Sequence, residues 1–417
     1  MENSSKITQS RFFDVLNFNK TGVITYLMSH SFRIHYNHGL LKAIKLSKEL
    51  NCPLQIILFK QPEANQRNND FFKDGIKGFK GFLSKFTENI FYFEEPSKNF
   101  YEILKNSSLV IKDRAYLFEH LVVEKAIEEF LFYNSISFTL VESNVVVPVI
   151  SASNKEEYSA RTIRPKIKSQ IDYYNDYIDF KAPYFHYEQV AREILDNFIE
   201  SKLSYYDQRN DPSNNYTSNL SAYLKYGFIS PLYIYNKVLK SNKANSDLFI
   251  EELIIRRELS YNFVFYNKKY YDFNHITYDW AYQSMNIHVN DKREYIYTID
   301  DYINFKTHDI YFNTAMKEMV ILGRMHGYMR MYWAKKIIEW SRDYNEAYQI
   351  IIYLNNYYFI DGFTPNGYCG VAWVFGKHDR AWKDRDIFGK IRYMNQAGLK
   401  RKFNIDDYVL NIEALTK

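Results

Sequence analysis

GVITYLM at residues 22–28 decides the fold, because it begins a series of short apolar runs that alternate with helical patterns. The series continues with a helix-like stretch around 37–50 and with the runs PLQIILF at 53–59, SLVIKD at 108–113 and SFTLVES at 137–143. This alternation predicts βαβ units and a Rossmann-like parallel sheet. No G-x-G-x-x-G follows the first run, so a dinucleotide site is not supported here. We expect a scaffold sheet with at most an auxiliary ligand.

The chain changes character after this sheet region. From 151 to 185 it is polar and irregular, and Pro165 would interrupt a helix that crossed it. Farther on, apolar residues recur three and four positions apart, which is typical of helices. These stretches cover 188–203, 219–241, 246–266, 311–340 and 343–356. A chain of 417 residues exceeds the usual size of one domain. We therefore predict an α/β domain over 1–150, a linker over 151–185 and an all-α domain over 186–417.

Composition argues against several classes of protein. Hydrophobic residues make up 46%, yet no apolar run approaches the ~20 residues that a membrane span needs. The first residues, MENSSKITQS, lack the basic-then-apolar order of a secretory signal, so we expect a cytoplasmic protein. Cys52 and Cys369 provide neither a disulfide framework nor a metal site, so we expect no metal. The net charge of +5 is spread over alternating signs and does not by itself indicate a nucleic-acid partner.

A polar cluster precedes the amphipathic helix expected from residue 219. It consists of Thr217, Ser218, Asn219 and Ser221. Hydroxyl groups at a helix N-terminus can help to hold a phosphate, but ordinary N-capping uses the same residue types. From the residues alone both interpretations stay open.

Tryptophan is confined to the last third of the chain. Trp333 and Trp340 are seven residues apart, which corresponds to two helical turns and roughly 10 Å of rise on one helix face. Such a pair is either core packing or a path for electrons to a redox cofactor. The spacing permits both.

Two further segments are rich in charge. Residues 354–403 combine glycine and proline with basic and aromatic side chains, which is the composition of a nucleic-acid contact or of a solvated basic face. EELIIRREL at 251–259 places acids and arginines one helical turn apart, as in ordinary surface ion pairs.

Taken together and in this order, long segments of the chain closely resemble class II cyclobutane pyrimidine dimer photolyases. The similarity covers residues 145 to 410, whereas residues 1–144 match the family's antenna domain mainly in layout. The segments are ASNKEEYSARTIRPKI at 152–167, RNDP at 209–212, EELIIRREL, NDKREYIY at 290–297, GRMHGYMRMYWAKKIIEW at 323–340 and the block 354–403. The resemblance implies FAD in the helical domain, reduced and excited by near-UV or blue light. It also implies a monomer that repairs DNA containing pyrimidine dimers by electron transfer to an extruded dimer.

The resemblance also implies roles for individual residues. The phosphate-binding turn would be Thr217, Ser218, Asn219, Leu220 and Ser221, and the other flavin contacts would be Tyr205, Arg209, Arg330 and Asp361. Asp379 would form an ion pair with Arg209, and Asn355 would face flavin N5. Glu252 would hydrogen-bond the dimer and present a proton to it, and Met331 and Trp373 would line its pocket. Lys390, Arg392 and Arg401 would contact DNA. Trp333 and Trp340 would belong to the electron path.

The chain departs from the family pattern at a few positions. Ala222 follows the phosphate turn where the family has proline, and Phe363 and Thr364 replace two charged residues near the cofactor. Phe312 stands where a middle electron-transfer tryptophan is expected, which leaves Tyr311 as a neighbouring phenol. Asn37-His38 replaces an Asn-Trp pair, so a deazaflavin or folate antenna stays an open question.

The departures keep two rival functions in consideration. One is a cryptochrome-like FAD photoreceptor, and the other is a flavoprotein that acts on a different substrate. Repair is favoured because a pure light sensor has no need of a dimer pocket, and the residues that argue for it are Glu252, Asn355, Met331 and Trp373.

Overall fold

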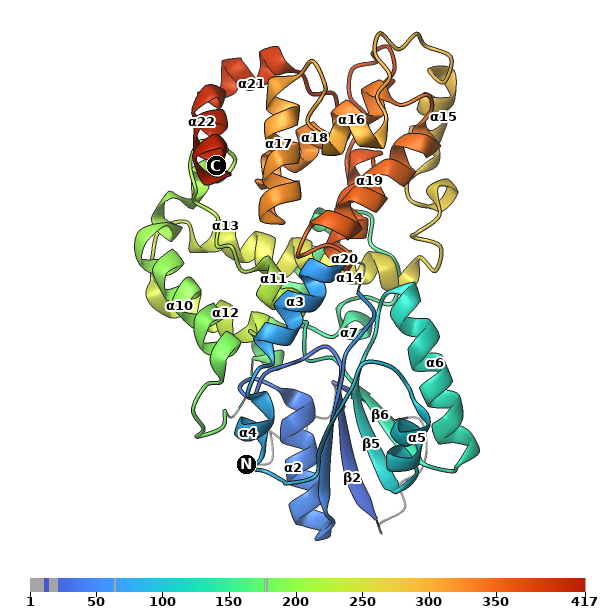
Figure 1. Ribbon diagram of the computed structural model, residues 1–417, viewed down its shortest axis with the longest axis vertical. Helices are drawn as coiled ribbons and strands as arrows, with labels where there is room; N and C mark the ends of the chain where they lie inside the picture. The colour runs from blue at the N-terminus through green and yellow to red at the C-terminus, as the bar shows by residue number, and fades with distance from the viewer. Residues whose placement is uncertain (1–10, 15–21, 64, 176, 178, 417) are drawn as a thin grey trace.

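The computed structural model describes residues 11–14, 22–63, 65–175, 177 and 179–416. The N-terminal segment on which the expectation about a secretory signal rests lies outside these residues. A lobe built on one sheet lies below a larger helical lobe in the view of Figure 1. The expected two-part architecture, with an α/β sheet region followed by a helical body, is confirmed.

The sheet has six strands in the order β1-β6-β5-β2-β3-β4, and every neighbouring pair except β1 with β6 is parallel. The strands are β1 Phe12–Asp14, β2 Val23–Met28, β3 Leu54–Phe59, β4 Ile90–Phe93, β5 Ser107–Asp113 and β6 Ser137–Val141. All four apolar runs in the sequence form strands, whereas β1 and β4 were not predicted. The order reverses beside β2, so the carboxyl ends of β2 and β5 open onto a crevice where ligands commonly bind.

Helices cover both faces of the sheet because its strands point apolar side chains both ways. Tyr26 and Met28 pack toward the face covered by α2, α3 and α4, and Leu27 packs toward α5 and α6. Figure 1 shows α2 and α4 on one side and α5 and α6 on the other. The helices are α2 His38–Leu50, α3 Gln66–Gly75, α4 Phe79–Leu83, α5 Lys98–Lys105 and α6 Phe118–Tyr133.

The connecting segment contains more helix than its composition predicts. It includes α7 Val149–Ala152, α8 Ala160–Lys168 and α9 Ile171–Tyr174. The expectation that Pro165 interrupts any helix here is wrong, since Pro165 lies within α8. A capping box of Ser159 and Thr162 starts this helix, and Ile163 and Ile167 are buried in the neighbouring core. Capping and burial offset the one backbone hydrogen bond that proline removes.

The helical lobe holds the largest buried core, which extends from Tyr116 to Ile412. Its elements begin with α10 His186–Ser201, the 3₁₀ turn η1 Leu203–Gln208, α11 Ser221–Lys225, α12 Pro231–Ser241 and α13 Ser246–Ile250. They continue with the π-helical turn η2 Glu251–Arg256, α14 Arg257–Tyr266, the 3₁₀ turn η3 Phe273–His275, α15 Asp279–Ile287 and α16 Ile299–Ile303. The last are α17 Ile310–Leu322, α18 Gly327–Trp340, α19 Tyr344–Tyr358, α20 Pro365–Val374, α21 Gln396–Lys402 and α22 Ile405–Leu415. No helix of the described residues is both long and apolar enough to cross a membrane.

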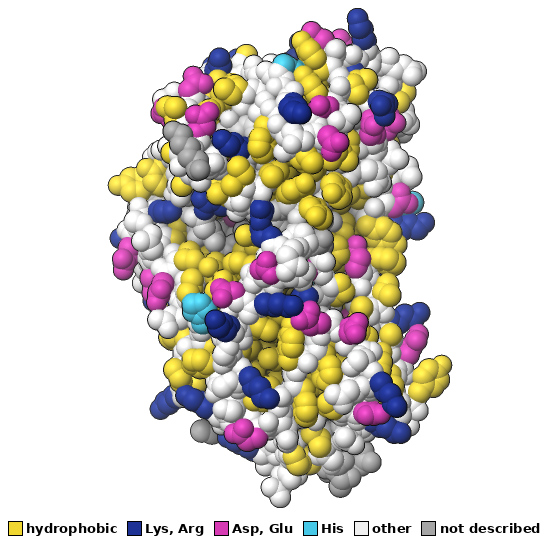
Figure 2. Space-filling model, viewed as in Figure 1, with side chains coloured by type: hydrophobic (Ala, Val, Ile, Leu, Met, Phe, Trp, Pro, Cys, Tyr) yellow, Lys and Arg dark blue, Asp and Glu magenta, His cyan; other side chains and the backbone are white. Residues whose placement is uncertain are grey.

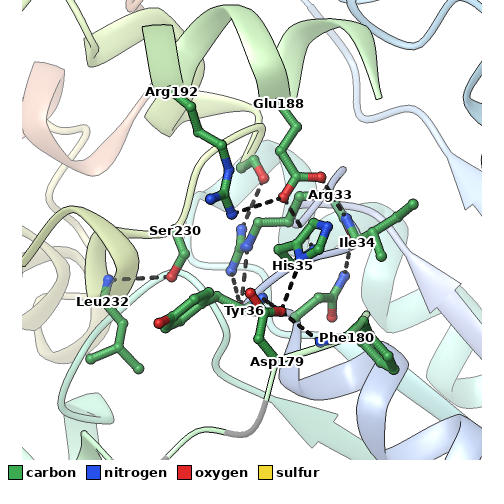
Figure 3. Close-up of polar contacts among 12 residues, drawn as sticks. Arg33, Ile34, His35, Tyr36, Asp179, Phe180, Glu188, Arg192, Ser230 and Leu232 are labelled. Atoms are coloured by element: carbon green, nitrogen blue, oxygen red, sulfur yellow. Dashed lines mark hydrogen bonds and ion pairs between the residues drawn. The ribbon is translucent and has the colours of Figure 1, made fainter. Parts of the chain in front are cut away.

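A buried polar network joins the two lobes where the chain leaves β2 (Figure 3). Arg33 donates to Asn144 Oδ1 at 2.7 Å and to the Gly227 carbonyl at 2.9 Å. Glu188 of α10 accepts the backbone N–H groups of Ile34 at 3.1 Å and His35 at 3.2 Å. Because buried polar groups are costly when unpaired, this network favours one specific placement of the lobes.

Candidate active site

Three contacts fix the orientation of the Arg330 side chain on α18. Its Nη2 lies 2.9 and 3.1 Å from the two carboxylate oxygens of Asp361, which follows α19. Its Nε donates to the Met325 carbonyl at 3.1 Å, and its guanidinium carbon lies 3.9 Å from the ring centre of Phe359. Charge-assisted bonds and ring stacking together restrict the guanidinium. Arg330 and Asp361 therefore form a preorganised pair, as their shared predicted role requires.

Asn355 lies near the end of α19 in a cradle made by two glycines. It is 5% exposed, and its Nδ2 donates to Asn356 Oδ1 at 3.0 Å. A Cβ atom on Gly367 would come within 2.8 Å of Asn355 Nδ2, and one on Gly362 within 2.3 Å of the Asn355 carbonyl oxygen. Only glycine permits approaches this close. The backbone from Gly362 to Gly367 is therefore shaped around the asparagine.

The polar cluster before α11 does not cap that helix. The N-cap position is Leu220, and no side chain of the described residues bonds to the first turn. Thr217 Oγ1 instead lies 3.3 Å from Asn219 Oδ1, and Asn219 has a left-handed backbone with a φ of 57°. Ordinary N-capping thus fails to explain why these hydroxyl and amide groups gather here. Tyr205 stacks on Tyr216 nearby, with 5.3 Å between ring centres.

Glu252 lies on the π-helical turn η2, a rare geometry that is frequent at functional sites. Its Oε1 accepts from Arg209 Nη2 at 3.1 Å and pairs with Arg256 Nε at 3.3 Å. In this arrangement the carboxylate accepts a hydrogen bond from one guanidinium group and forms an ion pair with a second.

The expected ion pair between Arg209 and Asp379 is wrong. Asp379 Oδ2 instead pairs with Arg392 Nε at 3.1 Å and accepts from Trp382 Nε1 at 3.2 Å. The reason lies in the chain path: Arg209 ends a turn that packs beside α13 and η2, whereas the loop after α20 folds back on itself around Asp379.

Met331 and Trp373, both predicted to line a dimer pocket, line one cavity. Its walls are Met331, Lys335, Trp373, Val374, Asp379 and Arg392. The Arg392 guanidinium lies 5.3 Å from the ring centre of Trp373. Arg392, which was predicted as a DNA contact, and Asp379, which was predicted as the ion-pair partner of Arg209, also lie in this wall. Sequence reasoning missed Lys335, although two adjacent lysines in a helix of apolar and aromatic residues were a usable signal.

The two tryptophans of α18 are both buried but have separate surroundings. Trp333 Nε1 donates to Met316 Sδ at 3.0 Å, and its ring centre lies 6.1 Å from that of Phe359. Trp340 packs on Phe312 with 5.0 Å between ring centres. Among the described residues no ring contact joins Phe312 to Trp333. The two tryptophans therefore belong to a packed core, and Phe312, which was expected between them in the electron path, has a described ring contact with only one of them, Trp340.

Two phenols have ring contacts with the pair formed by Phe312 and Trp340. Tyr297 lies 5.3 Å from Trp340 between ring centres, and Tyr302 contacts both members of the pair. Tyr302 lies 5.2 Å from Phe312 and 6.5 Å from Trp340 between ring centres. Tyr311 instead donates to Asp406 at 2.7 Å. Burial and that carboxylate raise the pKa of Tyr311 to about 12.

The predicted DNA-contacting residues differ in exposure. Lys390 and Arg401 are exposed, and Arg392 is half-buried by its bond to Asp379. On the face drawn in Figure 2, acidic and basic side chains are interspersed and hydrophobic side chains gather across the middle. This view agrees with the alternating charge of the sequence.

A second and larger cavity opens at the carboxyl edge of the sheet, between the two lobes. Its walls include His30, Lys60 and Asp113 from the sheet lobe and Tyr226 and Phe363 from the helical lobe. Asp113 accepts the backbone N–H groups of three consecutive residues, 29 to 31, at 2.9 to 3.1 Å. Here the sheet lobe provides the ligand crevice that its strand order predicts.

Two departures from the family pattern have local structural explanations. Thr364 caps α20, since its Oγ1 accepts the Gly367 N–H at 3.2 Å. Asn37 caps α2 by accepting the Leu40 N–H at 3.0 Å, and the adjacent His38 is fully buried in the sheet lobe.

One cluster could ligate a metal that the cysteine argument overlooked. His288, Asp291 and Asp386 place ligand atoms within 4.8 Å of one another. Both ring nitrogens of His288 already meet carboxylates, Asp291 at 2.6 Å and Asp384 at 2.8 Å.

Comparisons with known proteins agree with this architecture. A DNA photolyase family model matches residues 24–182. The chain is 40% identical to a deoxyribodipyrimidine photo-lyase from Methanothermobacter thermautotrophicus, with 94% of this chain and 95% of the relative covered. It is 35% identical to the Arabidopsis thaliana protein of the same name, covering 94% and 89%. A class III photolyase from Agrobacterium tumefaciens shares the fold with a TM-score of 0.70 at 17% identity, covering 95% of this chain and 87% of that one. With this architecture and these relatives across nearly its whole length, the chain belongs to the DNA photolyase family.

Proposed function

We propose that the protein is a class II cyclobutane pyrimidine dimer photolyase that uses light to split the dimer. The names of the relatives at 40% and 35% identity support a deoxyribodipyrimidine photo-lyase. The observation that carries the proposal is that consecutive residues of α18 serve the two predicted sites. Arg330 bonds Asp361 at the candidate flavin contact, and Met331 faces the cavity that contains Trp373.

The described residues fit FAD on two counts. Gly362 and Gly367 lie so close to Asn355 that any side chain larger than hydrogen at either position would clash with it, and this packing fixes the place of the Asn355 amide. The cluster before α11 offers hydroxyl groups and N–H groups that capping does not use. The residues that would hold the cofactor are Tyr205, Arg209, Thr217, Ser218, Asn219, Leu220, Ser221, Arg330, Asn355 and Asp361. Bound and reduced, FAD would supply the electron that near-UV or blue light promotes.

The chain's own residues would bind and orient the dimer. Trp373 and Met331 would pack on the extruded bases, whose release is made cheaper by their weak pairing in damaged DNA. Glu252 would turn from its arginine partners to hydrogen-bond the dimer, a contact that gains strength only as the dimer becomes negatively charged. Lys390 and Arg401 would neutralise phosphates around the lesion.

The remaining assignments are part of the same proposal. We divide the chain into an antenna-type domain over 1–150, a linker over 151–185 and a catalytic domain over 186–417. The cavity at the carboxyl edge of the sheet would take an antenna chromophore, a deazaflavin or a folate. The protein would act as a cytoplasmic monomer with access to DNA.

A repair assay tests the proposed function. The purified protein is loaded with FAD, reduced, and illuminated with an oligothymidylate that contains cyclobutane dimers, while thymine absorbance is followed. We expect absorbance to return in the light and not in the dark, and Trp373→Ala to weaken binding of the dimer. Bound FAD without any restored absorbance would instead identify a photoreceptor of the cryptochrome kind.

A further inference from the structure

Lys335 is a buried cation with no counter-charge of its own. It is 2% exposed, and no carboxylate of the described residues forms an ion pair with it. Its Nζ donates to the carbonyl oxygen of Val374, the last residue of α20. The next residue on the helix, Lys336, differs in this respect because it pairs with Glu339 at 2.6 Å. A buried ammonium without a paired anion is costly, so its presence calls for a functional explanation.

The position of Lys335 supplies that explanation. It lies one helical turn after Met331 on the same face of α18, and both line the cavity with Trp373. The charged groups that face it are Asp379 and Arg392. Asp379 is already bonded to Arg392 and therefore compensates the charge of Lys335 only in part. Two cations and one anion give these groups a charge of +1, which falls to zero when Lys335 loses its proton.

We propose that Lys335 supplies a buried positive charge that favours electron acceptance by the dimer, while its bond to Val374 fixes the end of α20 beside Trp373. This inference rests on the proposed function. It adds no covalent or redox step, because the dimer gains one electron and returns it, and the lysine only stabilises the transient negative charge. An ammonium is also the favourable partner for a helix C-terminus.

The protonation of Lys335 makes this role measurable. Burial, helped by Arg392 and opposed by Asp379, lowers the pKa of Lys335 to about 7. The pocket is therefore positive below that pH and loses its charge above it. Arginine stays charged throughout this range, and methionine fills a similar volume without charge.

The test compares Lys335→Arg, Lys335→Met and the control Lys336→Met, using fully reduced, FAD-loaded protein between pH 6 and 9. We expect the repair yield per absorbed photon to fall with pH in the wild type and in Lys336→Met. Lys335→Arg should keep a high yield with a flatter profile, and Lys335→Met should have a low yield at every pH. The loss is on the order of tenfold, the effect of one unit charge ~10 Å from the reacting atoms at an effective dielectric constant of ~20. Affinity for dimer DNA should change much less than yield.

A second measurement does not depend on repair. In protein labelled with ¹⁵N-lysine, one side-chain resonance should titrate near neutral pH and be missing from Lys335→Arg. If the wild type repairs no dimer at any pH, the proposed function fails while this titration still reports on the buried charge. Parallel pH profiles of yield in the wild type and Lys335→Arg would overturn the inference, as would full yield in Lys335→Met. If Lys335→Met does not fold, the arginine variant alone decides between these outcomes.

Discussion

Replacing Asp309 with alanine should destabilise the helical lobe more than loss of an ordinary helix cap. Asp309 is completely buried at the start of α17, where its Oδ1 accepts the N–H groups of Tyr311 at 3.0 Å and Phe312 at 3.1 Å. Its other oxygen accepts from the hydroxyl group of Tyr332 on α18. One carboxylate thus caps the start of α17 and also binds the neighbouring helix α18.

The expected loss in the free energy of unfolding is the sum of two contributions, one from the lost helix cap and one from the lost hydrogen bond of Tyr332. Loss of a helix N-cap costs about 1–2 kcal/mol. A buried Tyr332 hydroxyl left without a partner costs about 1–3 kcal/mol more. The free energy of unfolding should therefore fall by ~2–5 kcal/mol. A change of ~3 kcal/mol in a unit of this size lowers the midpoint of thermal unfolding by roughly 6–12 °C. Tryptophan fluorescence reports on this lobe, because all five tryptophans lie between residues 280 and 382.

Two companion variants isolate the buried bond. Asp343→Ala removes an exposed cap on α19, which accepts the Glu346 N–H at 2.8 Å, and should cost only about 1 kcal/mol. Tyr332→Phe completes a double-mutant cycle with Asp309→Ala and measures the coupling between the two side chains. If Asp309→Ala destabilised the protein no more than Asp343→Ala, or if the cycle gave additive effects, the reasoning would be refuted.

Three other predictions concern electron transfer, pH and salt. Phe312→Trp should speed photoreduction of oxidised FAD in transient absorption and leave repair by chemically reduced protein unchanged, because indole beside Trp340 is easier to oxidise than a phenyl ring. Carboxylates at both ring nitrogens raise the pKa of His288, so its stabilising effect is complete below about pH 6.5 and is lost as pH rises through the raised pKa. His288→Gln should remove that dependence from hydrogen exchange of residues 384–389, and an unchanged profile would contradict the assignment. Dimer-DNA affinity should fall steeply with salt, and Arg401→Ala should reduce the slope of log K against log salt by about 1, whereas an unchanged slope would exclude a phosphate contact.

Short-range patterns predict much of the fold. The four apolar runs became strands because each is short, β-branched or aromatic, and bounded by turns. β1 has only three residues and joins the sheet antiparallel at its edge, so no periodic signal could reveal it. Pro165 in α8 shows the opposite error. The rule that proline interrupts a helix predicted a break here, but the capping box and the burial of two isoleucines stabilise the helix.

The resemblance to a known family predicted which residues lie at the candidate site. It did not predict which of them pair with each other when they are far apart in the sequence. Met331 and Trp373 meet in one cavity as expected. Arg209 bonds Glu252 instead of Asp379, because η1 packs against α13, the helix that leads into η2, and no local sequence pattern encodes this packing. Lys335 was missed for a different reason, because a lysine in a helix is ordinarily assigned to the solvated face even where its helix neighbours are apolar.

The structure also separates two tasks that the sequence treats as one stripe of aromatic residues. Phe312 and Trp340 belong to a cluster with Tyr302 near the end of α18, whereas Trp333 bonds a methionine sulfur nearer its start. Arg330 and Met331 lie on the turn before Trp333, next to the candidate cofactor and dimer contacts. A substitution in the Phe312 cluster should therefore alter the supply of electrons to an oxidised cofactor without disturbing the dimer pocket. A substitution at Lys335 should disturb the dimer pocket without altering the supply of electrons, because its charge faces the pocket and its only described polar bond goes to α20. Different turns of α18 thus face the Phe312 cluster and the dimer pocket. Variants of the cluster and variants of the pocket can therefore be interpreted independently.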